Sequence, residues 1–251
     1  MDLFAAADAV VFDVEGVALD TEALWDEVQE RLLLRRGIAY DRAAIKPLLT
    51  GRSAADAVAV LAAVCGLPDD PADLLRERHA LMLDRLAGGV TLVPGFAELV
   101  RALAGRRPMA LATAMDPKLF ALADRSTGLS ALVGGPVVTL REVVPAVGRS
   151  DGLSPGLAPG PARRPLRGKP WPDLFQEACR LLGVPPERCL VVEDAPNGVA
   201  AAHRAGARCV AVATTHPAAL LADADAVCGS VADLVPVVSG LAERGAPYVC
   251  P

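Results

Sequence analysis

The chain has 251 residues, a formal net charge of -5 and a sequence pI of about 5.3. Its arginines are spread along the sequence, so the basic patch that nucleic acids bind is missing and we expect no nucleic-acid partner. The mean hydropathy of +0.36 is high, yet no run approaches the roughly 20 apolar residues of a membrane span, so we expect no membrane association.

The first predicted element is a buried strand. Ala9-Val10-Val11-Phe12 is an unbroken apolar run, as in parallel strands that are covered on both faces. Asp13 ends the run, and Glu15 and Gly16 follow. Open α/β sheets bind ligands at the carboxyl ends of their strands, so this acidic pair is a candidate site. Taken alone, an acidic pair that merely caps a helix is an equal alternative.

The next segment, residues 17–90, is predicted to hold three or four helices and shows no convincing strand. Apolar residues recur at helical spacing from Glu22 to Arg36. A capping box at Ser53 predicts a second helix that ends near Gly66. A third helix is predicted from Pro71 to Ala87. The segment lies directly behind the first strand's carboxylates, where a helical cap would be inserted.

Strands and helices alternate after this segment. We predict strands at 109–113, 189–192, 209–213 and 225–227, with helices at 94–103, from 116–117 onwards, at 172–182 and at 197–205. This alternation is typical of a parallel, doubly wound sheet. The predicted fold is therefore an α/β core of residues 1–16 and 91–251 with an inserted α-helical cap of residues 17–90.

A Pro/Gly-rich stretch at 145–165 has no periodicity and predicts a flexible loop within the core. Such a loop is either a flap near the site or, more often, a surface insertion without a role.

Two later segments carry residues suited to holding a phosphoryl group. Thr113 ends the predicted strand at 109–113, and its hydroxyl with the backbone amides from Ala114 onward can hold a phosphoryl oxygen. An isolated threonine there is more often a turn residue or a helix cap. Lys169, in Gly168-Lys169-Pro170-Trp171-Pro172, offers an ammonium that would neutralise a carboxylate nucleophile and a transferring phosphoryl group.

Glu193 and Asp194 end another apolar strand and lead by a tight turn into a helix. Adjacent carboxylates at the ligand edge of a sheet offer hard oxygen ligands, which suit magnesium. The alternative is an acidic pair at a helix N-terminus. Two interpretations stay open for three further residues. Trp25 and Trp171 either line the pocket or pack locally, and we favour packing; His216 either faces the site or lies in a surface loop, and we favour the loop.

These segments resemble, in order, the four motifs of the haloacid dehalogenase (HAD) superfamily, in its phosphoglucomutase-like phosphatase branch. The string from Asp13 to Glu22 is similar to the first motif, Asp-x-Asp-Gly followed by Asp-Thr, with Glu15 at the second aspartate. Thr113 matches the second motif, Gly-Lys-Pro-x-Pro around Lys169 the third, and the segment around Glu193 and Asp194 the fourth. The helical insert has the place of the family's C1 cap.

The resemblance implies roles for these residues. Asp13 would form an aspartyl-phosphate, Glu15 would act as acid and base, and Thr113 and Lys169 would hold the phosphoryl group. Magnesium would be bound by Asp13, Asp194 and the backbone carbonyl of Glu15, with Glu193 assisting. Because Glu15 keeps the carboxylate but adds about one C–C bond, ~1.5 Å, we expect a working enzyme that is slow or selective for its substrate.

Substrate contacts are expected from Ala114 and from Arg52. Arg52, in Gly51-Arg52-Ser53, looks like the substrate-facing turn of the cap, and a plain helix-entry turn is an equal alternative.

The predicted function is a magnesium-dependent phosphatase of a small phosphorylated metabolite, such as a sugar phosphate or a ribosyl or nucleoside-type 5'-phosphate. A phosphosugar mutase is the first alternative, and a non-catalytic phosphate-binding protein disabled by Glu15 is the second. We expect a monomer or a weak homodimer. The N-terminus has no basic region of the kind that begins a secretion signal, which predicts a cytoplasmic protein.

Overall fold

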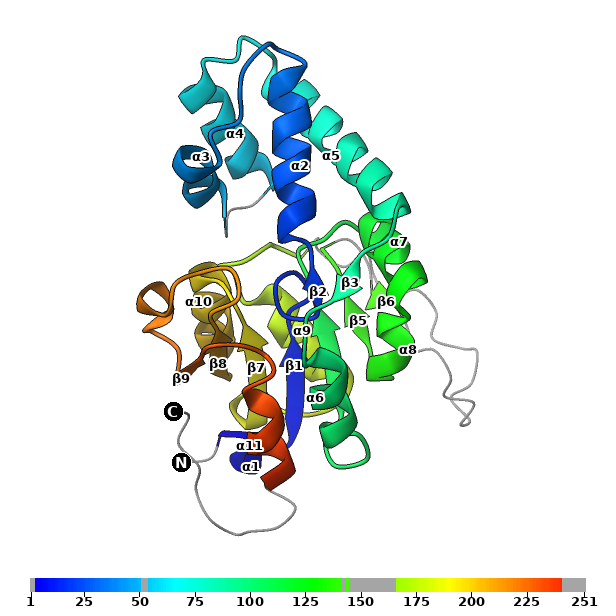
Figure 1. The fold of residues 1–251 in the computed structure, drawn as a ribbon. Helices are drawn as coiled ribbons and strands as arrows, with labels where there is room; N and C mark the ends of the chain where they lie inside the picture. The colour runs from blue at the N-terminus through cyan, green and yellow to red at the C-terminus, as the bar shows by residue number, and fades with distance from the viewer. Residues whose placement is uncertain (1–2, 51–53, 141–142, 145–165, 241–251) are drawn as a thin grey trace.

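A computed structural model describes residues 3–50, 54–140, 143–144 and 166–240. Its centre is a seven-stranded sheet in the order β6-β5-β4-β1-β7-β8-β9 (Figure 1). Six strands run parallel, and β6 pairs antiparallel with β5 at one edge. The predicted doubly wound parallel sheet is confirmed. The strands are β1 Ala9–Phe12, β4 Met109–Ala112, β5 Val137–Val138, β6 Val143–Val144, β7 Cys189–Glu193, β8 Arg208–Val212 and β9 Ala226–Cys228.

The register of the central strands aligns their carboxyl ends. Phe12 pairs with Leu111 of β4 on one side and with Val192 of β7 on the other. The apolar runs that form β1 and β4 are buried along their whole length. The side chains of these strands are covered by helices on both faces of the sheet. The polar residues that follow each strand therefore lie at the carboxyl edge of the sheet, beyond the apolar core. Asp13, Thr113 and Asp194, three of the predicted site residues, directly follow strands at that edge.

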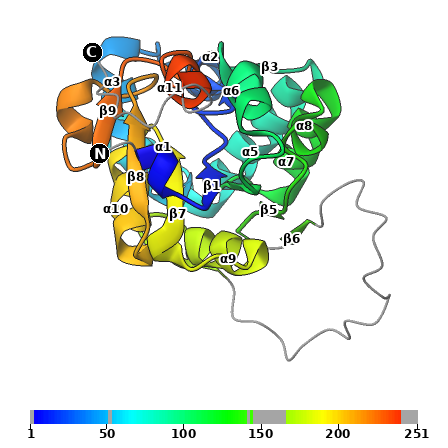
Figure 2. The same ribbon diagram turned by 90° about the horizontal axis from the view of Figure 1, so that it is seen from below.

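Helices cover both faces of the sheet (Figure 2). One face is covered by α6, α7, α8 and α11, which pack against Val10, Phe12 and Leu111 of the sheet. Phe96 of α6 belongs to the same core and contacts Phe12 edge to face. On the other face, α9 and α10 pack against Val11 and its neighbours. These helices, with the short N-terminal one, are α1 Leu3–Ala6, α6 Phe96–Leu103, α7 Pro117–Thr127, α8 Leu129–Val133, α9 Asp173–Leu182, α10 Pro196–Ala205 and α11 Leu234–Gly240. Two 3-10 helices are η1 Pro186–Arg188 and η2 Ala218–Leu221.

Four helices of the insert form a group of their own beyond the sheet (Figure 1). They are α2 Glu22–Leu34, α3 Arg42–Leu49, α4 Ala54–Cys65 and α5 Pro71–Ala87. Their position confirms the predicted helical insert after the first strand. The boundaries given for it, 17–90, stay a prediction.

The expectation that residues 17–90 hold no strand is wrong at one place. Leu19–Asp20 forms β2, which pairs antiparallel with β3, Thr91–Leu92, beyond the insert. Two residues are too few to show an alternating pattern, and their partner lies about 70 residues away along the chain. The pair brings the two ends of the helical insert together.

Some predictions fall outside the described residues. These are the loop at 145–165 and the capping box at Ser53. None of the helices in the described residues has both the length and the apolar character needed to cross a bilayer.

Candidate active site

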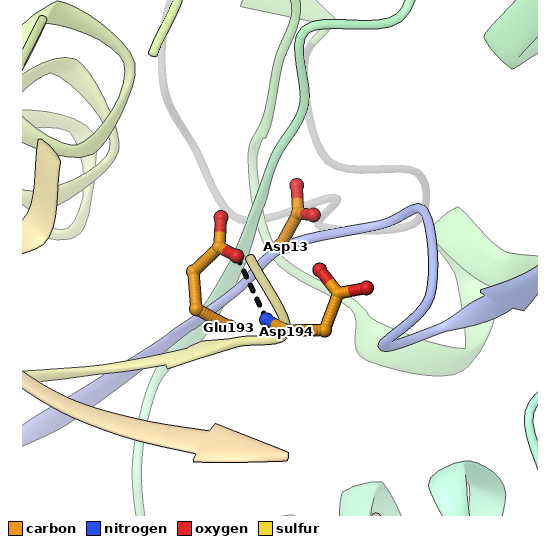
Figure 3. Close-up of side chains that lie close together, drawn as sticks. All are labelled: Asp13, Glu193 and Asp194. Carbon is orange, nitrogen blue, oxygen red and sulfur yellow. Dashed lines mark hydrogen bonds between the residues drawn. The ribbon is translucent and has the colours of Figure 1, made fainter. Parts of the chain in front are cut away.

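Three buried carboxylates meet at the carboxyl ends of β1 and β7. Asp13 directly follows β1, Glu193 ends β7, and Asp194 comes next. One carboxylate oxygen from each residue lies within 4.8 Å of those of the other two. Figure 3 shows the three side chains grouped, with Glu193 Oε2 accepting a hydrogen bond from the Asp194 amide at 2.7 Å. The three side chains meet because β1 and β7 are parallel neighbours with aligned ends.

Lys169 lies between two of these carboxylates. Its Nζ is 2.5 Å from Asp13 Oδ1 and 2.5 Å from Glu193 Oε1. The ammonium also lies 5.3 Å from the ring centroid of Phe175 in α9. Burial alone would lower the pKa of Lys169, but the charges of Asp13 and Glu193 outweigh it and raise the pKa above its ordinary value. Lys169 is therefore a fixed positive charge in the site.

Burial makes this cluster costly to ionise. It raises the pKa of Asp13 from 3.8 to about 7, although Lys169 opposes the shift. Burial, together with the charges of Glu193 and Asp13, also raises the pKa of Asp194 well above its ordinary value. Among the described residues, three carboxylates share one ammonium group, so the ionised cluster holds two uncompensated negative charges. Hard oxygen ligands with that charge fit a divalent metal ion.

The loop after β8 contacts the loops that follow β1 and β7. Thr214 Oγ1 donates a hydrogen bond to the Gly16 carbonyl at 2.6 Å, and the Thr215 hydroxyl donates to Asp194 Oδ2. His216, predicted as a surface-loop residue, is half-buried with Nδ1 3.0 Å from the Asp194 carbonyl oxygen. Sequence reasoning missed both threonines. One feature of the sequence could have indicated them: both follow shortly after the apolar run that forms β8, at the same sheet edge as Asp13 and Asp194.

Thr113 and Ala114 follow β4, the other neighbour of β1. Thr113 is fully buried, and its amide donates to the Val138 carbonyl at 2.9 Å. Its hydroxyl oxygen accepts a hydrogen bond from the Met115 amide at 3.0 Å, which leaves the hydroxyl proton to donate. Ala114 is exposed. Both residues lie at the edge that holds Asp13, and their predicted roles in phosphoryl binding stay predictions.

Glu15 lies apart from the three carboxylates and contacts the helical insert. Its Oε1 accepts a hydrogen bond from Trp25 Nε1 of α2 at 2.8 Å. Burial raises the pKa of Glu15, and the hydrogen bond from Trp25 opposes that shift. We predicted local packing for Trp25, and its indole does pack against the hydrophobic core. The hydrogen bond to Glu15 was not predicted. Arg52, predicted to bind substrate, lies outside the described residues.

Comparison with known proteins identifies the family. The family model for haloacid dehalogenase-like hydrolases matches residues 7–206. The chain belongs to this family. The match covers every predicted catalytic and metal-binding residue from Asp13 to Asp194, and it confirms the resemblance drawn from the motifs.

Three relatives of this HAD hydrolase illustrate the likeness. Validoxylamine A 7'-phosphate phosphatase of Streptomyces hygroscopicus subsp. limoneus is 32% identical over 217 residues, which are 86% of this chain and 90% of the relative. A HAD family hydrolase from Deinococcus radiodurans R1, solved with bound phosphate and sodium, is 31% identical with a TM-score of 0.68, covering 97% and 100% of the two chains. A putative beta-phosphoglucomutase from Thermotoga maritima shares the fold, with a TM-score of 0.66 at 22% identity, covering 93% and 99%.

Proposed function

We propose that this HAD hydrolase is a Mg²⁺-dependent phosphatase that hydrolyses a small phosphorylated metabolite through an aspartyl-phosphate on Asp13. The observation that carries the proposal is the buried cluster of Asp13, Glu193 and Asp194 with Lys169 between two of its members. The phosphatase activity of the validoxylamine relative supports the same reaction class.

The proposed chemistry has two steps. A carboxylate oxygen of Asp13 attacks phosphorus, the bond from phosphorus to the ester oxygen breaks, and Glu15 gives that oxygen a proton so that an alcohol leaves. Glu15, now ionised, takes a proton from water, whose oxygen attacks phosphorus and releases inorganic phosphate from Asp13. Lys169 and Thr113 hold the phosphoryl oxygens during both steps.

Asp13, Asp194 and the backbone carbonyl of Glu15 would hold Mg²⁺, with Glu193 assisting. When bound, the ion supplies positive charge that offsets the charge of the phosphoryl group and of the cluster. Asp13 must be ionised to attack, and Lys169 favours that form by opposing the effect of burial on its pKa. The residues present therefore fit both the ion and the nucleophile.

The substrate class follows from the cap and the relatives. A helical insert beyond the strand ends favours small molecules over proteins as substrates. The validoxylamine relative is named for a small phosphorylated metabolite. We therefore propose a sugar phosphate or a ribosyl or nucleoside-type 5'-phosphate, with Arg52 and Ala114 among the contacts.

The test is phosphate release from a panel of sugar and nucleoside phosphates, with and without Mg²⁺. Wild type is run beside Asp13→Asn, Glu15→Asp and Asp84→Asn, a control in α5 whose side chain is 71% exposed. Release that requires Mg²⁺, is lost in Asp13→Asn and persists in Asp84→Asn supports the proposal. Wild type that is inactive while Glu15→Asp is active would mean that Glu15 disables the site. Conversion of one sugar phosphate to another without net release would indicate a mutase.

A further inference from the structure

The contact between Trp25 and Glu15 joins the helical insert to the catalytic loop. Trp25 lies in the first turn of α2, where its amide donates to the Thr21 carbonyl at 3.0 Å. Glu15 lies three residues beyond the end of β1. The indole Nε1 and Glu15 Oε1 are 2.8 Å apart, a normal hydrogen-bond distance to a carboxylate. A residue of the insert thus fixes a side chain of the core.

The length of the glutamate side chain is what allows this contact. An aspartate at position 15 would end about one C–C bond, ~1.5 Å, closer to the backbone. From the present backbone and the present place of Trp25, its carboxylate would not reach the indole at hydrogen-bond distance. The extra methylene of Glu15 therefore brings its carboxylate within hydrogen-bond distance of the Trp25 N–H on the insert.

The indole is itself held in place by Arg78 of α5. The Arg78 guanidinium carbon lies 3.9 Å from the centroid of the Trp25 ring. Arg78 is buried, and its Nε donates to Gln29 Oε1 of α2 at 3.2 Å. A cation stacked on an aromatic face and tied to the same helix restricts rotation of the ring. Trp25 therefore presents its N–H from a defined position.

Glu15 keeps one oxygen for chemistry. Oε1 accepts the hydrogen bond from Trp25, whereas no residue in the described part of the chain donates a hydrogen bond to Oε2. A carboxyl group held by one oxygen and open at the other can give or take a proton at the open oxygen. Proton transfer needs the acid within hydrogen-bond reach of the leaving oxygen, so restricting the carboxyl group's rotation favours it.

We propose that Trp25 is a positioning residue for Glu15, whose indole N–H holds one carboxylate oxygen so that the other faces the leaving group of the substrate. The inference rests on the proposed phosphatase function. It makes the acid and base step depend on the insert, because the donor comes from α2. Trp25 does not itself touch the reacting atoms.

The test compares Trp25→Phe with Tyr40→Phe, using the best substrate of the panel. The control removes another aromatic donor of the insert, whose hydroxyl donates to the Asp26 carboxylate at 3.0 Å within the insert itself. We expect Trp25→Phe to lower kcat by about 10-fold or more, with KM changed by less than about 3-fold, because the lost interaction serves the transition state. Tyr40→Phe is expected to keep kcat near that of wild type.

A double-variant comparison separates positioning from simple packing. Glu15→Asp cuts the same hydrogen bond from the other side with little change to the fold. If Trp25 acts through Glu15, the double variant with Trp25→Phe and Glu15→Asp has the same kcat as Glu15→Asp alone, whether that single variant is slower or faster than wild type. Effects that multiply would show that Trp25 acts independently and would overturn the inference.

The remaining outcomes also decide the matter. An active wild type whose kcat is unchanged by Trp25→Phe would overturn the inference and leave the phosphatase proposal intact. A rise in KM alone would assign Trp25 to substrate binding and also overturn it. A wild type inactive on the whole panel would overturn the proposed function, and the inference with it. Thermal unfolding of each variant shows that the proteins compared are folded.

Discussion

Gly198, in the first turn of α10, leaves the space that the carboxylate of Glu193 occupies. A Cβ atom at position 198 would overlap that carboxylate, and Glu193 is fully buried. The first turn of the helix after β7 thus requires glycine at position 198, because the Glu193 carboxylate occupies the space that a side chain would need. This relationship makes the acidic cluster sensitive to a single methyl group.

Gly198→Ala is therefore expected to impair the site. Alanine favours a helix over glycine by up to about 1 kcal/mol, so a plain helical position would gain stability. At position 198 we expect the displaced Glu193 to lower kcat by about 10²-fold, as misplacements near 1 Å can. The control is Gly240→Ala in α11, where the added Cβ meets nothing within 4 Å. Equal kcat for the two variants would contradict the prediction, with unfolding temperatures measured alongside.

Gly16→Ala tests the loop after β1. Gly16 has a φ of +77°, and an added Cβ would overlap Asp194 Oδ2. Gly37 has a similar φ of +70° with open space around it, so Gly37→Ala carries the backbone strain without the overlap. We expect both variants to lose roughly 1 kcal/mol of stability from strain, while only Gly16→Ala also loses activity on the best substrate of the panel. Similar activity in the two would show that Asp194 tolerates displacement.

Lys169→Met removes the ammonium group between Asp13 and Glu193. We expect kcat to fall by at least about 10²-fold, because a preorganised charge that stabilises the transition state is lost. The metal-free variant is also expected to unfold at a lower temperature, since two buried carboxylates lose their partner. Lys118→Met on the exposed side of α7 serves as the control. Activity within a few-fold of wild type would remove Lys169 from the proposed chemistry.

A pH-dependent effect is expected at Asp26 in α2. Its carboxylate accepts hydrogen bonds from Tyr40 at 3.0 Å, Arg42 at 2.7 Å and Lys46 at 2.8 Å. Burial alone would raise the pKa of Asp26, but these donors outweigh it and lower the pKa below 3.8. The stabilisation is therefore fully present above the unfolded pKa and is lost as the pH falls through the folded one.

Asp26→Asn should accordingly lower the free energy of unfolding by about 1–3 kcal/mol at pH 7. The difference from wild type should shrink below about pH 4. Urea unfolding over a range of pH values measures both effects. Asp84→Asn, which removes an exposed pairing with Arg31, should cost less than about 1 kcal/mol. A pH-independent loss at Asp26 would show that shape rather than charge matters there.

The position of Asp13, Glu193 and Asp194 at one edge of the sheet could be predicted from the sequence, because apolar runs located the strands and parallel strands bring their carboxyl ends to one edge. That the three carboxylates form one group was expected only from the motif resemblance, since the apolar runs do not say that β1 and β7 are neighbours. Lys169 was expected there only through the motif around it. It lies in a loop before α9, and loop geometry is not encoded in a short periodic pattern.

The contact between Trp25 and Glu15 could not be predicted in this way. It depends on where the insert sits over the core, which is a long-range packing result. Three or four helices were predicted for the insert, and helix α3 is the one whose bounds were not assigned, because Pro47 lies inside it and proline argues against a helix. The available signal was Asp41, whose side chain accepts a hydrogen bond from the Ala44 amide at 3.0 Å as an N-cap.

The pairing of β2 with β3 has a consequence for how such enzymes diversify. Leu19 lies beside Leu92 and Asp20 beside Thr91, so the chain leaves the core and re-enters it at one point. Because the two ends of the insert are adjacent, its length and its number of helices can change without moving β2 or β3. A two-residue hairpin turn could even join Asp20 directly to Thr91 in place of the whole insert. The insert can therefore differ in size and sequence while the sheet and the residues at its edge keep their positions.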